Sequence, residues 1–221
     1  MENDIKILNE ILNILNEEDL LDHMILIGSW AEFLFEELNI IENFSATTKT
    51  TDIDFLVPNI NRPRKKVSLS RILKERGYES KTERLSKVNK FIKDEFEIEF
   101  LARQIGKPTK QEDVPSLGIK VETLKHMNVI YKNVITVSYN NLKINIPSPE
   151  AFVISKMIIN RDRSEAKKEK DKISINNLII TMMDVEKNIE KLKKLYNEDT
   201  TKKEKKYINE YIERNGIPLN F

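Results

Sequence analysis

The sequence contains no cysteine and only two histidines, His23 and His126. The lack of cysteine excludes disulfides, thiolate zinc sites and cysteine nucleophiles, and two isolated histidines argue against a histidine-rich metal site. Any bound metal is therefore expected to be a hard cation held by carboxylate oxygens.

Long apolar runs are also absent, since the longest are Met24–Ile27 and Ala151–Ile154. A helix that crosses a bilayer needs about 20 apolar residues. The segment Met1–Asp4 is acidic and lacks the basic n-region of a signal peptide. We therefore expect a cytoplasmic protein that makes no membrane contact.

The charges nearly cancel, because 37 Lys and Arg stand against 36 Asp and Glu for a net charge of +1. No global basic field indicates nucleic acid as a partner. Hydrophobic residues make up 39% of the chain, which is enough for a core, and 221 residues fit one large or two small domains.

The sequence pattern changes at Pro147-Ser148-Pro149. Before this point helical stripes alternate with short apolar strands, and after it the chain is helical and strongly charged. The pattern predicts an α/β part over residues 1–147 and an all-helical part over residues 148–221.

Periodicity predicts the main elements of the first part. A polar loop is expected over Asn43–Thr51, and three short β-type runs over Asn128–Ile146. The predicted helices are Asp4–Glu17, Trp30–Leu38, Ser68–Arg76 and Ala151–Asn160; the predicted strands are Met24–Ile27, Asp52–Val57, and a hairpin of Val88–Ile92 with Phe96–Leu101.

Gly28-Ser29 stands where a strand gives way to a helix. Glycine lets an oxyanion approach the backbone, and a helix N-terminus offers unpaired N–H groups and a positive dipole end. A phosphate group is the natural ligand for such a junction. A helix-capping serine that follows a turn glycine is the structural alternative.

Asp52 and Asp54 open the strand that continues as Phe55-Leu56-Val57. Alternate residues of a strand share a face, so both carboxylates point the same way while Ile53 and Phe55 point into the core. A divalent cation such as Mg²⁺ relieves the repulsion between such a pair. Two solvated surface aspartates are the alternative.

Glu97 and Glu99 form a second alternating acidic pair, on the strand Phe96–Leu101. If this strand lies beside the Asp52 strand, one glutamate completes a cluster of three carboxylates. Such a cluster can hold two Mg²⁺ ions for phosphoryl transfer. Glu99 is preferred because Glu99-Phe100-Leu101 repeats the setting of Asp54-Phe55-Leu56, while Glu97, or a solvent-facing role for both, stays open.

The combination resembles the nucleotidyltransferase superfamily with the DNA polymerase beta-like fold. The resemblance rests on three short motifs in order: Gly28-Ser29, Asp52-x-Asp54, and a third carboxylate on a later strand. The later stretch is similar to bacterial members, including toxin-type enzymes of type IV toxin–antitoxin and abortive-infection systems. It comprises Ser148-Pro149-Glu150, Lys156, Arg161, Arg163, Lys170 and Asp171.

The resemblance implies an α+β fold, with a nucleotidyltransferase-type mixed sheet, flanking helices and an all-helical C-terminal domain. It implies that Asp52, Asp54 and Glu99 are catalytic and bind two Mg²⁺ ions, or Mn²⁺. The nucleotide-binding residues that it implies are Gly28, Ser29, Lys156 and Asp171.

The activity implied is the transfer of a nucleoside monophosphate from an NTP to an acceptor hydroxyl. By analogy with the family, tRNA or another RNA is the first acceptor to consider, then a protein side chain or an aminoglycoside, and an antitoxin protein is a candidate partner. Two alternatives remain at this point: an inert protein that uses this fold to bind nucleotide or a partner, and a helical interaction protein.

Overall fold

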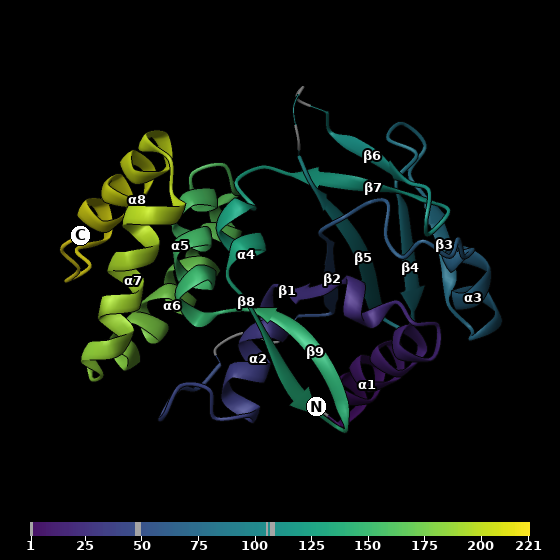
Figure 1. Cartoon of the computed structure of the whole chain (residues 1–221), viewed down its shortest axis with the longest axis horizontal. Helices are drawn as coiled ribbons and strands as arrows, with labels where there is room; N and C mark the ends of the chain where they lie inside the picture. Colours follow the sequence, from purple (N-terminus) through teal and green to yellow (C-terminus); the bar gives the residue numbers. More distant parts are fainter. Residues whose placement is uncertain (1, 47–49, 105, 107–108) are drawn as a thin grey trace. The chain divides into compact units, whose positions relative to one another are not determined.

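The structure, a computed structural model, describes residues 2–46, 50–104, 106 and 109–221. The chain divides into two compact units, whose elements Figure 1 labels. The first unit comprises Met1–Trp30, Thr50–Leu124 and Ile135–Ile146, and the second comprises Ala31–Lys49, Lys125–Val134 and Pro147–Phe221. The division of the chain at residue 147 into a catalytic core and a helical domain stays a prediction.

The first unit is built on a mixed sheet in the order β1-β2-β5-β4-β3, with β7 also pairing with β5 and β6 with β7. Strands β2 and β5 run parallel, whereas β1 pairs antiparallel with β2 and β4 pairs antiparallel with β5. The strands are β1 Ile25–Ile27, β2 Asp52–Val57, β3 Glu79–Thr82, β4 Asn89–Lys93, β5 Phe96–Arg103, β6 Gln111–Val114 and β7 Ile119–Leu124. A separate two-stranded sheet pairs β8 (Val134–Tyr139) with β9 (Leu142–Pro147).

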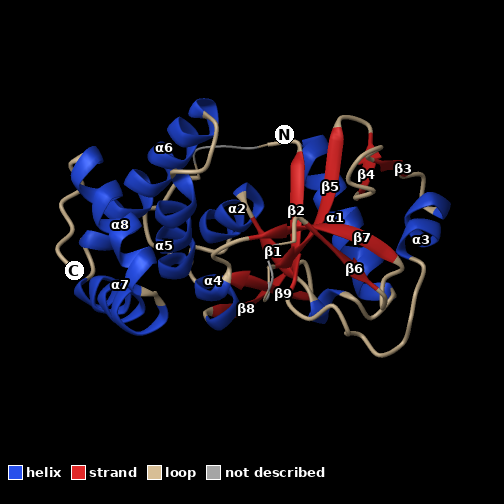
Figure 2. Ribbon diagram, turned by 90° about the horizontal axis from the view of Figure 1, so that it is seen from above, coloured by secondary structure: helices blue, strands red, loops and turns tan. Residues whose placement is uncertain are grey.

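One face of the main sheet is apolar and covered by a helix. Ile53 and Phe55 of β2 are fully buried, and Phe55 stacks on Phe100 of β5 at 5.6 Å between ring centroids. Lys93 lies on this face and binds Glu10 of helix α1 (Glu2–Glu17), which stands behind the strands in Figure 2. The alternate residues of β2 and β5 therefore point to the opposite face, which is where the acidic side chains lie.

The remaining helical elements of the first unit are the 3₁₀ turn η1 (Leu21–His23) and helix α3 (Leu69–Glu75). Helix α2 (Ser29–Glu37) begins in the first unit and continues in the second. Its first residue, Ser29, follows Gly28 directly after the end of β1, and this junction is part of the candidate site.

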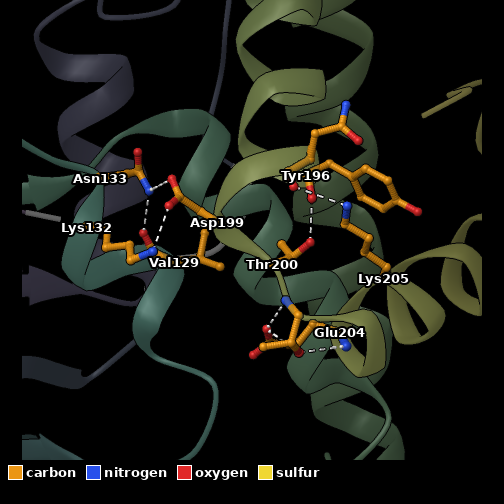
Figure 3. Close-up of polar contacts among 10 residues, drawn as sticks. Val129, Lys132, Asn133, Tyr196, Asp199, Thr200, Glu204 and Lys205 are labelled. Atoms are coloured by element: carbon orange, nitrogen blue, oxygen red, sulfur yellow. Dashed lines mark hydrogen bonds and ion pairs between the residues drawn. The ribbon is translucent and has the colours of Figure 1, made fainter.

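The second unit is helical, and its helices are α4 Asn128–Lys132, α5 Pro149–Asn160, α6 Glu165–Met183, α7 Glu186–Asp199 and α8 Lys202–Asn215. Helix α5 is buried over most of its length, and Ser148 caps it by accepting a hydrogen bond from the Ala151 amide. Asp199, at the end of α7, accepts hydrogen bonds from Lys132 and Asn133 (Figure 3). A capping box of Thr201 and Glu204 opens α8. No helix among the described residues has the length and apolarity needed to cross a bilayer.

Most predicted elements are confirmed within a residue or two, including the hairpin of β4 and β5 and the buried strand β2. One prediction is wrong: the first of the three β-type runs expected over Asn128–Ile146 is helix α4, while the other two are β8 and β9. Strands β6 and β7 are not among the predicted elements. In the loop expected over Asn43–Thr51, residues 47–49 lie outside the described part of the chain.

Candidate active site

Four acidic residues lie side by side on the face of the sheet opposite to Ile53 and Phe55. The parallel register of β2 and β5 places Asp52 opposite Glu97 and Asp54 opposite Glu99. Asp52 is exposed and Asp54 is half-buried, whereas the Glu99 side chain is only 20% exposed. The condition stated from the sequence, that the glutamate strand lies beside the Asp52 strand, is therefore met.

Gly28 lies directly against this acidic group. It follows β1, whose Ile27 is opposite Asp54, and it has a φ of +71°. A Cβ atom at this position would be 2.9 Å from Oδ2 of Asp54, closer than real Cβ atoms come to a neighbour. Only glycine therefore allows both the left-handed turn and the close approach of Asp54 to the backbone.

Ser29, the first residue of α2, is linked to the strand that carries the aspartates. Its hydroxyl lies 2.6 Å from the hydroxyl of Thr50, which in turn donates a hydrogen bond to the carbonyl of Asp52 at 3.3 Å. The beginning of α2 and the entrance to β2 are thus held together by two side chains. Sequence reasoning does not single out Thr50, which lies in a polar stretch without periodicity.

Lys90 of β4 is the cation next to the two glutamates. Its ammonium donates a hydrogen bond of 2.7 Å to Glu97, forms an ion pair with Glu99, and lies 3.8 Å from Glu83. Lys90 is opposite Glu99 in the antiparallel register of β4 and β5. Sequence reasoning missed it, although counting outward from the pair Lys93 and Phe96 at the hairpin turn gives this partnership.

The two glutamates differ in their acidity. Burial, a hydrogen bond with Glu97 and the charge of Asp54 raise the pKa of Glu99 to about 7, although Lys90 opposes the rise. The same hydrogen bond with Glu99, supported by Lys90, lowers the pKa of Glu97. Glu99 is therefore the weaker acid of the two.

The residues present fit a hard divalent cation by chemistry and by register. Asp52, Asp54 and Glu99 supply carboxylate oxygens from neighbouring strands, which are the donors that Mg²⁺ and Mn²⁺ prefer. Their side chains are not gathered around one point, since no three acidic or histidine side chains of the described residues form a ready metal site. Glu97 and Glu99 converge instead on the ammonium of Lys90.

Lys156 and Asp171, the other two predicted nucleotide-binding residues, are brought together in the second unit. Lys156 donates a 2.8 Å hydrogen bond to Asp171 and lies 4.9 Å from the ring centroid of Phe152. Asp171 is buried and also pairs with Arg163 at 3.1 Å. Two cations thus share one carboxylate, and their part in nucleotide binding stays a prediction.

Comparison with protein families decides the class of the protein. The model of a family described as Nucleotidyltransferase matches residues 6–200, which is most of the chain. The chain belongs to the nucleotidyltransferase family. It is therefore an enzyme of the class that transfers nucleoside monophosphates, and the acidic face of β2 and β5 is the candidate active site of this nucleotidyltransferase.

Solved structures share the fold of this nucleotidyltransferase at low sequence identity. ANT(2″)-Ia in complex with adenylyl-2″-tobramycin has a TM-score of 0.51 at 13% identity, over 95% of this chain and 99% of that chain. The solution structure of the antibiotic-resistance factor ANT(2″)-Ia gives 0.50 at 11% identity, over 97% and 94%. An antigenic nucleotidyltransferase-like protein from Paracoccidioides brasiliensis gives 0.50 at 13% identity, over 93% and 87%.

A search of curated protein sequences finds no match to this chain. The structural likenesses show the fold alone, and they confirm the predicted α+β class with its mixed sheet and C-terminal helices.

Proposed function

We propose that this nucleotidyltransferase transfers a nucleoside monophosphate from an NTP to an acceptor hydroxyl, with release of pyrophosphate, in a reaction that depends on Mg²⁺. The observation that carries the proposal is the parallel register that sets Asp54 beside Glu99, with Gly28 against Asp54. Acids on two strands and a glycine at a helix start supply both parts of a phosphoryl-transfer site, the carboxylates and the phosphate cradle.

Each of these residues has a distinct task in the proposed reaction. Gly28 and Ser29 bind the phosphates of the NTP through the backbone and a hydroxyl, while Asp52, Asp54 and Glu99 hold divalent metal. The metal, when bound, neutralises charge on the phosphates and on the oxygens that attack and leave. Glu99 accepts the proton of the acceptor hydroxyl as the general base of the proposed reaction.

Two classes of acceptor are compatible with the proposed reaction. An RNA end, tRNA first, follows from the resemblance to toxin-type enzymes, and it would bring an antitoxin as partner and a cytoplasmic location. A small hydroxylated amine follows from the structural likeness to ANT(2″)-Ia, whose complex contains adenylyl-2″-tobramycin. Lys156 and Asp171 are proposed to act on the nucleotide in either case.

The test is a transfer assay with all four NTPs labelled at the α-phosphate, in Mg²⁺, against total tRNA, tobramycin and a protein extract in separate reactions. We expect label on one acceptor class with the parent protein and none with Asp54→Asn. Asp94→Asn, at an exposed acid of the β4–β5 turn, is the matched control and should transfer at the parental rate. Equal transfer by Asp54→Asn would overturn the proposed mechanism.

A second candidate function is that of an inert protein that binds nucleotide or a partner. The observation that favours it is the ion pairing of Lys90 with both glutamates, which occupies carboxylate oxygens that metal would need. This function predicts no transfer to any of the three acceptor classes, together with nucleotide binding that Asp54→Asn leaves unchanged.

A further inference from the structure

The acidic face continues into a row of charges that crosses four strands. The registers place Asp54 of β2, Glu99 of β5, Lys90 of β4 and Lys81 of β3 opposite one another in turn. Residues opposite one another in a sheet project from the same face. Two acids are therefore followed by two lysines in one line, and Lys90 stands at the junction of the two signs.

Lys90 contacts both glutamates at once. Its side chain is 23% exposed, and its ammonium contacts Glu97 and Glu99, which are themselves 33% and 20% exposed. Burial lowers the pKa of Lys90, but hydrogen bonds to Glu97 and Glu99 outweigh this effect and raise it above its usual range. Lys90 is thus a permanent positive charge beside the acidic group.

The pairing with Glu99 conflicts with metal binding, whereas the pairing with Glu97 does not. A divalent cation held by Asp54 and Glu99 would lie beside the Lys90 ammonium, and the two positive charges would repel each other. Glu97 lies opposite Asp52, one alternate position away from Glu99 along β5, and already accepts a hydrogen bond from Lys90. Lys90 can therefore release Glu99 without losing its acidic partner.

We propose that Lys90 is a positioning residue of the acidic site, which holds Glu97 and Glu99 together in the metal-free protein and pairs with Glu97 alone once divalent metal binds Glu99. This inference rests on the proposed function, because it requires that Glu99 is a metal ligand. It assigns the two glutamates different tasks, Glu99 to the metal and Glu97 to the lysine. It also means that Lys90 weakens the affinity of the site for divalent cations.

The test is the dissociation constant of Mn²⁺ alone, measured by electron paramagnetic resonance of the free ion on the full chain. Lys90→Met removes the charge and keeps an unbranched side chain, so we expect Mn²⁺ to bind about tenfold more tightly. Lys81→Met removes an exposed charge from the same row and should change the constant by less than about threefold, because water and salt screen it. Unchanged or weaker binding by a folded Lys90→Met variant would overturn the inference.

A double-mutant cycle tests the division of tasks and does not depend on one variant. Glu97→Gln leaves Lys90 with Glu99 as its closest acidic partner, so we expect weaker Mn²⁺ binding, and the addition of Lys90→Met should remove that effect. If Glu97→Gln weakens binding equally with and without Lys90, then Glu97 is itself a ligand and the inference fails. If Lys90→Met does not fold, Lys90→Gln replaces it in the cycle, and the same two outcomes support or overturn the inference.

Asp54→Asn separates this inference from the proposed function. If Asp54→Asn abolishes Mn²⁺ binding and Lys90→Met leaves it at the parental value, only the inference about Lys90 fails. If the parent protein binds no Mn²⁺, the inference and the metal-dependent function fail together.

Discussion

At the scale of single residues, the backbone conformation of Gly28 and the position of the Asp54 carboxylate depend on each other. Gly28 combines a positive φ with so close an approach of Asp54 that a Cβ atom built on Gly28 would lie 2.9 Å from Oδ2 of Asp54. A non-glycine residue in the left-handed region costs about 1–2 kcal/mol before any steric clash is counted. Gly28 therefore fixes where Asp54 can place its carboxylate.

We expect Gly28→Ala to lower the free energy of unfolding by more than this backbone cost, because the new methyl group must displace Asp54. Gly216 is the matched control, since its φ of +61° is similar and a Cβ there meets no heavy atom of the described residues within 4 Å. Urea unfolding of Gly28→Ala and Gly216→Ala measures the difference. Equal losses would contradict the role of the Asp54 contact.

The raised pKa of Glu99 predicts a pH dependence of stability in the metal-free protein. The pKa is about 7 in the folded state and lies near the ordinary value of 4.5 in the unfolded state, so the folded state binds more protons between these limits. The contribution of Glu99 to stability is therefore full below about pH 4.5 and is lost as pH rises toward 7. Glu99→Gln removes this contribution.

Chemical unfolding of the parent and of Glu99→Gln from pH 5 to pH 8, in a metal chelator, measures this effect. The variant should gain stability relative to the parent as pH rises. Glu95→Gln, at an exposed acid near the hairpin turn, should follow the parent curve. Parallel curves for the parent and Glu99→Gln would show that the pKa of Glu99 is not raised.

At the scale of elements, helix α5 depends on a cap that is visible in the sequence. Ser148 accepts a hydrogen bond from the Ala151 amide at 3.2 Å, and Pro149 follows at the first helical position. Loss of such a cap costs about 1 kcal/mol. Ser164 occupies the same position before α6 without a side-chain hydrogen bond to the helix.

We therefore expect Ser148→Ala to lower the free energy of unfolding by about 1 kcal/mol and Ser164→Ala to lower it by only a few tenths. Thermal and urea unfolding of the two variants makes the comparison. A loss in Ser164→Ala as large as that in Ser148→Ala would contradict the specific role of the cap.

Elements whose own periodicity decides their structure could be predicted from the sequence. Strand β2 and the hairpin of β4 and β5 are examples, because apolar alternation and a two-residue turn are local signals. Helix α4 resembles a strand in sequence because Asn128–Lys132 carries β-branched residues, and its packing in the second unit outweighs that preference. Strand β6 escaped prediction because Gln111–Val114 is mostly polar and is specified by its partner β7. Strand β7 was missed although Ile119 and Val121 alternate with polar residues, which is a local strand signal.

The candidate site was predictable in its residue types but not in its pairing. Asp52, Asp54, Glu97 and Glu99 stand out in the sequence, whereas the parallel register that aligns them is a long-range property of the sheet. Lys90 was missed for a related reason, because its importance depends on its position opposite Glu99 in the sheet. Thr50 carried no local signal at all.

At the scale of the whole molecule, the family match and the fold give the class of reaction, and the acidic face gives its proposed location. The acceptor is not needed for this assignment, because the proposed metal and phosphate contacts involve the NTP and not the acceptor. The central claim is therefore that the carboxylates of β2 and β5 and the Gly28-Ser29 junction bind nucleotide through divalent metal.

The most direct measurement is calorimetric binding of a non-hydrolysable NTP analogue with and without Mg²⁺, for the parent, Asp54→Asn and Asp94→Asn. The account predicts binding that requires Mg²⁺ and that weakens at least about 100-fold in Asp54→Asn, roughly 2.7 kcal/mol, while Asp94→Asn matches the parent. Equal binding by the parent and Asp54→Asn, or binding by the parent that is the same in a chelator, would contradict it.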